Sequence, residues 1–172
     1  MKKIGAVLLI FALIFIGYFF IKTPKPEQQK EEQIVPLPGM PMVGKNLPKL
    51  TVQFLKEQID ISGKPVMIDF WGVLCPPCIE SMPHLNEIYK KYQLQGLEVI
   101  GITIDDKETV EKFLEQRPVD YRIAIDKDSK YSDIIIPEGN IPHIILANRK
   151  GKIVWEGHPV DLKDSDIEKI LK

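Results

Sequence analysis

The hydrophobic pattern of the chain alternates between apolar runs of strand length and stretches with helical spacing. Residues 66–71 form an apolar run interrupted by one aspartate, and residues 97–104 form a second run rich in Val and Ile. Runs of this kind are typical of buried strands. Short edge strands are expected at residues 50–52 and 59–61, a further short strand at 121–125, and a hairpin of two strands at 143–147 and 152–156.

Helical spacing follows several of these strands. Val110, Phe113 and Leu114 recur at helical intervals within residues 107–117, and Pro118 ends the segment. Further helices are expected after Cys78 to about residue 92, near 128–134 and at 161–171. Because strands and helices alternate before the final hairpin, the sequence predicts an α/β fold, with a mixed central sheet and helices on both faces.

The N-terminal segment does not belong to this alternation. An apolar run occupies residues 4–21, between Lys2-Lys3 and Lys22, and a run of about 18 apolar residues is just long enough to cross a bilayer. We expect residues 1–22 to form one uncleaved transmembrane helix. A cleaved signal peptide is the alternative, but the run ends in bulky residues rather than a small-x-small site. The paired lysines should stay in the cytoplasm by the positive-inside rule.

The composition of the rest of the chain adds two constraints. Residues 23–43 are rich in proline and charged side chains, so we expect an extended linker between the anchor and a domain at 44–172. That domain would face the periplasm, or the outside of a cell with a single membrane. The formal net charge of -1 gives no electrostatic basis for binding nucleic acid.

The chain has two cysteines, Cys75 and Cys78, three positions apart. A strand precedes them and a helix follows, which is the context in which a C-x-x-C pair is typical of a redox centre. We expect Cys75 to be the attacking thiolate, because a helix N-terminus stabilises negative charge. Cys78 would be the shielded thiol that resolves the mixed disulfide. A structural disulfide and a metal site are the alternatives, although so small a loop stabilises a fold little and a closed metal site needs two more ligands.

The residues around this pair carry a resemblance to a known family. This chain resembles thioredoxin at Pro83 and over one continuous run, which is Asp69-Phe70-Trp71-Gly72-Val73-Leu74-Cys75-Pro76-Pro77-Cys78. The likeness is greatest to the membrane-tethered TlpA-like and ResA-like thiol–disulfide oxidoreductases. It extends over residues 43–172, including the loop and strand at 139–146 and the hairpin at 148–159. Leu74 is a departure, since most relatives carry Trp there, and it affects the expected partner-docking surface.

The resemblance implies roles for four further residues. Asp69 matches the buried acid of thioredoxin, which could relay a proton to or from Cys78; a half-exposed strand aspartate is the alternative. Pro142 matches a cis-proline whose loop faces the first cysteine, and Ile141 would offer backbone hydrogen bonds to an extended partner segment. Trp71 is expected on the active-site surface, with core packing as the alternative.

Other matches to the family are weaker or absent. Asp106 falls where ResA-like proteins place an acid near the redox site, and a solvated helix cap is the alternative. Copper carriers of the same fold have the wider C-x-x-x-C spacing, and peroxidases of the fold carry Thr where this chain has Gly72. Copper delivery and peroxidase activity are therefore the alternative functions.

The function implied by the resemblance is extracytoplasmic thiol–disulfide exchange through Cys75 and Cys78. TlpA-like and ResA-like proteins mostly act as reductants, for example of apocytochrome c or of copper-site cysteines, and Pro77 before Cys78 resembles reducing thioredoxins. We expect a monomeric disulfide reductase without a cofactor. Its partners would be disulfide-containing proteins and a membrane protein that donates electrons.

Overall fold

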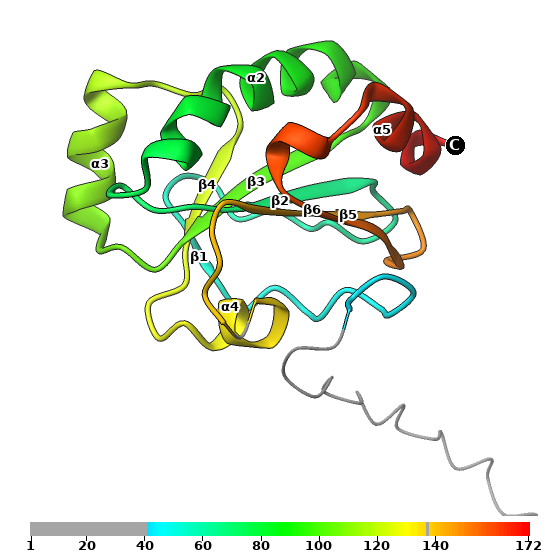
Figure 1. The fold of residues 1–172 in the computed structure, drawn as a ribbon, viewed down its shortest axis with the longest axis horizontal. Helices are drawn as coiled ribbons and strands as arrows, with labels where there is room; N and C mark the ends of the chain where they lie inside the picture. Colours follow the sequence, from blue (N-terminus) through cyan, green and yellow to red (C-terminus); the bar gives the residue numbers. More distant parts are fainter. Residues whose placement is uncertain (1–40, 137) are drawn as a thin grey trace, which may run out of the picture. The chain divides into compact units, whose positions relative to one another are not determined.

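The computed structural model describes residues 41–136 and 138–172, which form one six-stranded sheet with helices on both sides (Figure 1). The strand order is β1-β4-β3-β2-β5-β6. The strands are β1 (Gln53–Phe54), β2 (Val66–Phe70), β3 (Glu98–Thr103), β4 (Arg122–Ile125), β5 (His143–Ala147) and β6 (Ile153–Gly157).

The sheet is mixed, as expected from the sequence. β2, β3 and β4 are parallel to one another, whereas β1, β5 and β6 pair antiparallel at the two edges. Parallel neighbours need long crossover connections. The helices α2 (Pro76–Tyr92) and α3 (Lys107–Gln116) provide them, so the start of α2 lies at the carboxyl end of a central strand.

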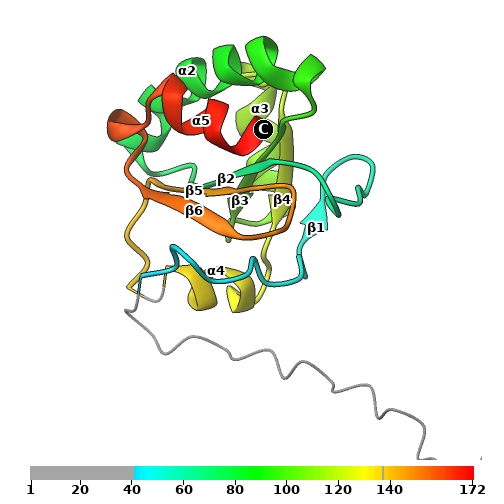
Figure 2. The ribbon, with the colours of Figure 1, turned by 90° about the vertical axis from the view of Figure 1, so that its right-hand side faces the viewer.

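Helices cover the two faces of the sheet unequally. α2, α3 and α5 (Asp164–Leu171) pack on one face and α4 (Lys130–Ile135) on the other (Figure 2). Short 3₁₀ segments also occur in the described part of the chain, at η1 (Gln93–Gln95) and η2 (Pro159–Asp161). All five residues of β2 are buried: Met67 packs in the α2 cluster, whereas Ile68 and Phe70 pack in the α4 cluster. Burial on both faces explains why this strand is an apolar run without alternation.

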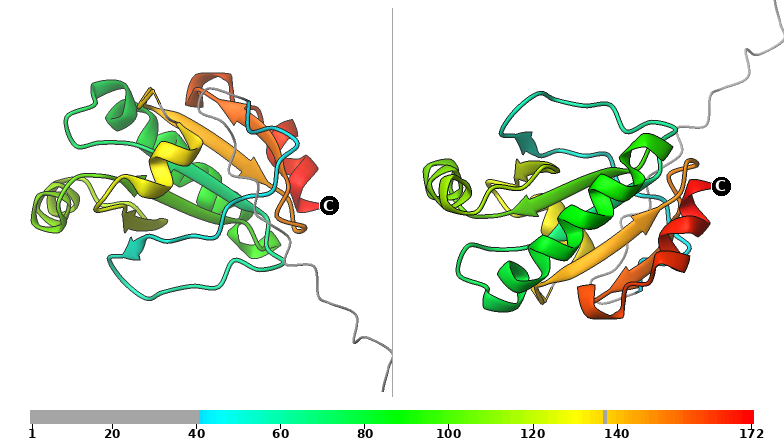
Figure 3. Two further views of the ribbon diagram at one scale, coloured as in Figure 1. Left: turned by 90° about the horizontal axis from the view of Figure 1, so that it is seen from below. Right: turned by 90° about the horizontal axis from the view of Figure 1, so that it is seen from above.

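α2 is the longest helix of the described residues and runs across one face of the sheet (Figure 3). Its buried side carries Cys78, Met82, Leu85 and Ile88, which recur every three or four residues. Burying a side chain of this size stabilises the fold by about 1.5–3 kcal/mol. The packing of this face holds the N-terminus of the helix, and with it both cysteines, in place.

Two of the expected strands differ from the structure. β1 lies just beyond the expected residues 50–52, and residues 59–61 form no strand. Asp60 Oδ1 accepts a hydrogen bond from the Ser62 N–H over 2.9 Å. This local bond bends the backbone into a turn, which outweighs the strand preference of the neighbouring isoleucines.

The described part of the chain begins at the end of the expected linker. The expected anchor, residues 1–22, and residues 23–40 of the linker lie outside it. Met42 is buried, and its N–H donates to Glu156 Oε1 over 2.9 Å. The packed domain therefore includes residue 42, slightly ahead of the boundary expected at 44. Between residues 41 and 172, as far as they are described, no helix is long and apolar enough to span a membrane.

Candidate functional site

The two cysteines lie in the segment that joins β2 to α2, and we call residues 72–78 the redox turn. Cys75 is the N-cap residue of α2 and is joined to Cys78 by a disulfide bond. Cys75 is 9% exposed, whereas Cys78 is fully buried. The first cysteine is therefore the less buried of the two, which is the direction of the difference that an attacking and a resolving thiol require.

Few amide groups are available to the first sulfur. Pro76 and Pro77 occupy the first positions of α2 and have no N–H. The Cys78 N–H is the first amide donor, and it donates to Cys75 Sγ over 3.3 Å. In the reduced protein this bond would stabilise a thiolate at Cys75.

Asp69 lies in β2, on the face covered by α2. It is fully buried, and neither carboxyl oxygen has a hydrogen-bond partner in the described part of the chain. Burial raises the pKa of Asp69 to about 7. A carboxyl group with this pKa can both give and take a proton near neutral pH. The burial expected from the resemblance is confirmed, and the half-exposed alternative is wrong.

Trp71 was expected on the active-site surface, with core packing as the alternative. Its side chain is 2% exposed and packs against Phe113, with ring centroids 5.5 Å apart. The indole is thus packed in the core, but it also lines a small pocket next to Ile141, so its role toward a partner stays a prediction. Gly101 permits this position, because a Cβ there would lie 3.0 Å from Trp71 Nε1 and 2.9 Å from Ile123 Cδ1. Gly101 is also the β3 partner of Asp69, and an isolated glycine within an apolar run was the available sequence signal.

The segment before β5 lies against the redox turn. The Ile141–Pro142 peptide bond is cis, as the resemblance implied. Ile141 is 38% exposed, and its Cδ1 would lie 3.3 Å from a Cβ placed on Gly72. β5 pairs with β2 so that Phe70 faces His143, which brings Pro142 beside the carboxyl end of β2. The structure thus brings Ile141 and Pro142 next to the turn that carries the cysteines.

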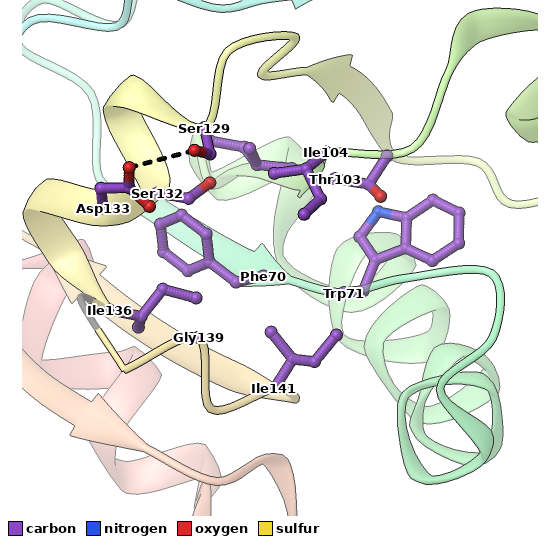
Figure 4. Close-up of a pocket in the computed structure, with 11 residues that line it drawn as sticks. Phe70, Trp71, Thr103, Ile104, Ser129, Ser132, Asp133, Ile136, Gly139 and Ile141 are labelled. Carbon is purple, nitrogen blue, oxygen red and sulfur yellow. Dashed lines mark hydrogen bonds between the residues drawn. The ribbon is translucent and has the colours of Figure 1, made fainter.

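A pocket of about 90 Å³ opens beside this segment (Figure 4). Its lining is mostly apolar and comes from β2, the end of β3, α4 and the loop before β5; the residues are Phe70, Trp71, Ile102, Thr103, Ile104, Ser129, Ser132, Asp133, Ile136, Gly139 and Ile141. Its size and lining suit an apolar side chain. The sequence did not indicate this pocket, because four separate segments form it.

Two adjacent acids after β3 have different surroundings. Asp106 accepts hydrogen bonds from the N–H and hydroxyl of Thr109, at 3.0 and 2.6 Å, and these bonds hold the pKa of Asp106 below its ordinary value. It is the N-cap of α3, so the helix-cap alternative is correct. Asp105 contacts the redox turn instead, because its Oδ2 accepts from the Val73 N–H over 2.8 Å. Sequence reasoning missed Asp105, since either acid could have capped α3.

Metal ligands do not gather in the described residues. Between 41 and 136 and between 138 and 172, no group of three or more His, Cys, Asp or Glu side chains is placed to hold a metal ion together.

Comparisons with known proteins point to the same chemistry. The family model described as Redoxin matches residues 43–171. The thiol-disulfide oxidoreductase ResA of Bacillus cereus is 36% identical over 117 residues, which cover 65% of this chain and 67% of that protein. ResA of Bacillus thuringiensis subsp. konkukian is 33% identical over 137 residues, 76% of this chain and 77% of the relative. The crystal structure of the thioredoxin domain of a Bacteroides vulgatus thiol-disulfide oxidoreductase superposes with a TM-score of 0.62 at 26% identity, covering 76% of this chain and 98% of that domain.

Proposed function

We propose a reducing role for this chain, which belongs to the Redoxin family and is a ResA-like thiol–disulfide oxidoreductase of the thioredoxin superfamily. In this proposal it reduces disulfides of partner proteins through Cys75 and Cys78. The observation that carries the exchange chemistry is the unequal burial of the two cysteines at the start of α2, 9% exposed for Cys75 and 0% for Cys78, and the reducing direction comes from the resemblance to ResA-like proteins.

The reaction begins with the reduced dithiol. The Cys75 thiolate attacks one sulfur of the partner's disulfide, so that an intermolecular S–S bond forms and the other partner sulfur leaves as a thiolate and takes up a proton. Cys78 then loses its proton and attacks Cys75 Sγ, and the second partner sulfur leaves and is protonated. Two electrons pass to the partner, which gains two thiols while the Cys75–Cys78 disulfide closes.

Asp69 is the group proposed to take the proton of Cys78. It lies on the α2 face of the sheet, where Cys78 is buried, and its pKa of about 7 suits proton transfer near neutral pH. Water has little access to this region, so a buried base is needed for the resolving step. Asp69 returns the proton when the dithiol is regenerated.

The partner segment is proposed to lie across the redox turn beside Ile141 and Pro142. Backbone groups of Ile141 would pair with an extended chain, in the manner of an added strand. Leu74, 91% exposed, precedes Cys75 and leaves an apolar side chain at the position where most relatives carry Trp. The docking surface is therefore still apolar, and the neighbouring pocket could hold one side chain of the partner.

The location and the partners are further parts of the proposal. Residues 1–22 would anchor the chain in the cell membrane and residues 23–43 would act as a spacer, with the domain facing the periplasm or the cell exterior. A reductant in that compartment needs a supply of electrons, which a membrane protein would provide. Apocytochrome c and copper-site cysteines are the substrate classes implied by the resemblance, and the protein would act as a monomer without a cofactor.

Reduction of insulin disulfides by the full-length chain tests this function. We expect Cys75→Ser to abolish reduction, whereas Cys78→Ser should accumulate a mixed disulfide through Cys75 because the resolving thiol is missing. Equilibration of the chain with glutathione would give its reduction potential and hence its direction. Alkylation of Cys78 alone in the reduced protein would contradict the assigned roles.

A further inference from the structure

The carboxylate of Asp105 joins the redox turn to the end of a central strand. Its Oδ2 accepts from the Val73 N–H over 2.8 Å and from the Thr103 hydroxyl over 2.7 Å. The Asp105 N–H in turn donates to Thr103 Oγ1 over 3.1 Å. Thr103 is buried and is the last residue of β3. The acid is therefore fixed to the sheet, and it holds the turn by one backbone amide.

The held amide lies where it can control the position of the first cysteine. Val73 is two residues before Cys75, and the Cys75 N–H closes the turn by donating to the Gly72 carbonyl over 3.1 Å. A Cβ on Gly72 would lie 3.5 Å from Asp105 Oδ2 and 3.3 Å from Ile141 Cδ1. The turn thus lies close to both Asp105 and the segment before β5.

The position of the Cys75 sulfur matters unusually strongly in this chain. Pro76 and Pro77 offer no N–H, so the sulfur depends on the single 3.3 Å bond from the Cys78 amide. A small displacement of the turn would lengthen that bond, and hydrogen bonds weaken steeply with poor geometry. A loosened turn should therefore yield a less acidic Cys75 thiol in the reduced protein.

We propose that Asp105 is a positioning residue for thiol–disulfide exchange, which keeps the Cys75 sulfur within reach of the Cys78 amide by holding the Val73 N–H. The inference rests on the proposed function only for the role of Cys75 as the attacking thiol. A direct effect of the negative charge would act in the opposite direction, because removing a nearby carboxylate lowers the pKa of a thiol.

Because both hydrogen bonds end on one carboxylate oxygen of Asp105, single substitutions can separate the effect of the bonds from that of the charge. In Asp105→Asn the amide oxygen can take the place of Oδ2 and accept both bonds without a charge. Asp105→Ala removes both bonds. Thr103→Val removes the hydroxyl that orients the carboxylate, at nearly the same volume. Asp106→Ala is the matched control, since it removes the neighbouring charge from a site that contacts Thr109 rather than the redox turn.

The rate of Cys75 alkylation by iodoacetamide, followed against pH in the reduced full-length chain, measures the thiol pKa of each variant. Mass spectrometry identifies the alkylated cysteine, and circular dichroism verifies folding. We expect Asp105→Ala to raise the pH midpoint of Cys75 alkylation, and hence the thiol pKa, by about one unit, which is a tenfold loss of thiolate below that midpoint. Thr103→Val should shift it in the same direction by less. In Asp105→Asn and Asp106→Ala the alkylation rate of Cys75 should stay within about twofold of that of the unchanged protein, which corresponds to a pKa change of about 0.3 unit.

Three outcomes would overturn the inference. A lower midpoint in Asp105→Ala would mean that the charge acts rather than the hydrogen bond. An equal rise in Asp105→Asn and Asp105→Ala would mean that an acceptor for the Val73 N–H is not what sets the thiol pKa. An unchanged midpoint in folded Asp105→Ala would mean that the contact is only structural. If Asp105→Ala does not fold, an unchanged alkylation midpoint in Thr103→Val would contradict the proposal. Alkylation needs no partner protein, so a chain that fails to reduce insulin would refute the proposed function while these profiles stay readable.

Discussion

Asp69 and Asp126 are two buried aspartates in contrasting surroundings. Asp126 follows β4, and its Oδ2 accepts from the Ser132 N–H of α4 over 2.7 Å. Asp69 lies in the region covered by α2, and neither of its oxygens has a partner in the described part of the chain. A buried carboxylate that receives an amide donor contributes to structure, because the bond offsets lost hydration. A buried carboxyl group without a donor is unfavourable for folding, and at a redox site it is available to carry a proton.

Asp69→Asn should give the largest change in stability, as a loss of pH dependence. The pKa of Asp69 is raised from 3.8 in the unfolded chain to about 7 in the fold. Between these values the unfolded state has released the proton and the folded state still holds it, so stability falls as pH rises. The total loss is about 4 kcal/mol, complete above pH 7 and absent below pH 4.

The free energy of unfolding of oxidised wild-type and Asp69→Asn chains, measured by urea denaturation from pH 4 to 8, tests this expectation. The difference between the two chains isolates the contribution of Asp69 from that of other titrating groups. Equal pH slopes in the two chains would show that Asp69 is ionised in the fold, and the contrast with Asp126 would disappear.

Asp126→Ala should have the next largest effect. It leaves the Ser132 N–H without its acceptor, and losing a hydrogen bond to a charged group costs about 1.5–3 kcal/mol. Thermal and urea unfolding at pH 7 would measure the loss. Asp128→Ala is the control, because its ion pair with Lys130 is exposed and contributes at most about 1 kcal/mol. A loss for Asp126→Ala no larger than that of the control would contradict a structural role.

Gly101→Ala should have the smallest effect on stability of the three variants. Because Gly101 pairs with Asp69 across β2 and β3, we also expect the substitution to shift the titration of Asp69. The new methyl group would lie 2.9 Å from Ile123 Cδ1 and 3.0 Å from Trp71 Nε1, so these side chains must shift, at a cost of about 1–3 kcal/mol. Adding Ile123→Val removes the nearer atom and should restore part of the stability. A single variant as stable as wild type, with an unchanged Asp69 titration, would show that Gly101 has no influence on this site.

Local patterns in the sequence predicted many of the helices and strands. The apolar run beginning at Val66 predicted β2, and the intervals of Val110, Phe113 and Leu114 predicted α3. Residues 59–61 were wrongly predicted as a strand, because a side-chain bond from Asp60 to the backbone is stronger there than an average preference for strand. The near-complete burial of Trp71, which follows β2, could not be decided from the sequence, because it depends on which helix packs over that residue.

The sequence by itself determined the chemistry of this protein: two cysteines at helical spacing, a strand before them and an acid within that strand. These features are encoded by neighbours within a few residues, where periodicity and turn preferences act. Only the tertiary structure decided which acids matter and how. Val73 and Asp105 are 32 positions apart and meet because β2 and β3 are adjacent and parallel. The pKa of Asp69 likewise depends on burial by helices that pack over the sheet, and no local pattern specifies that burial.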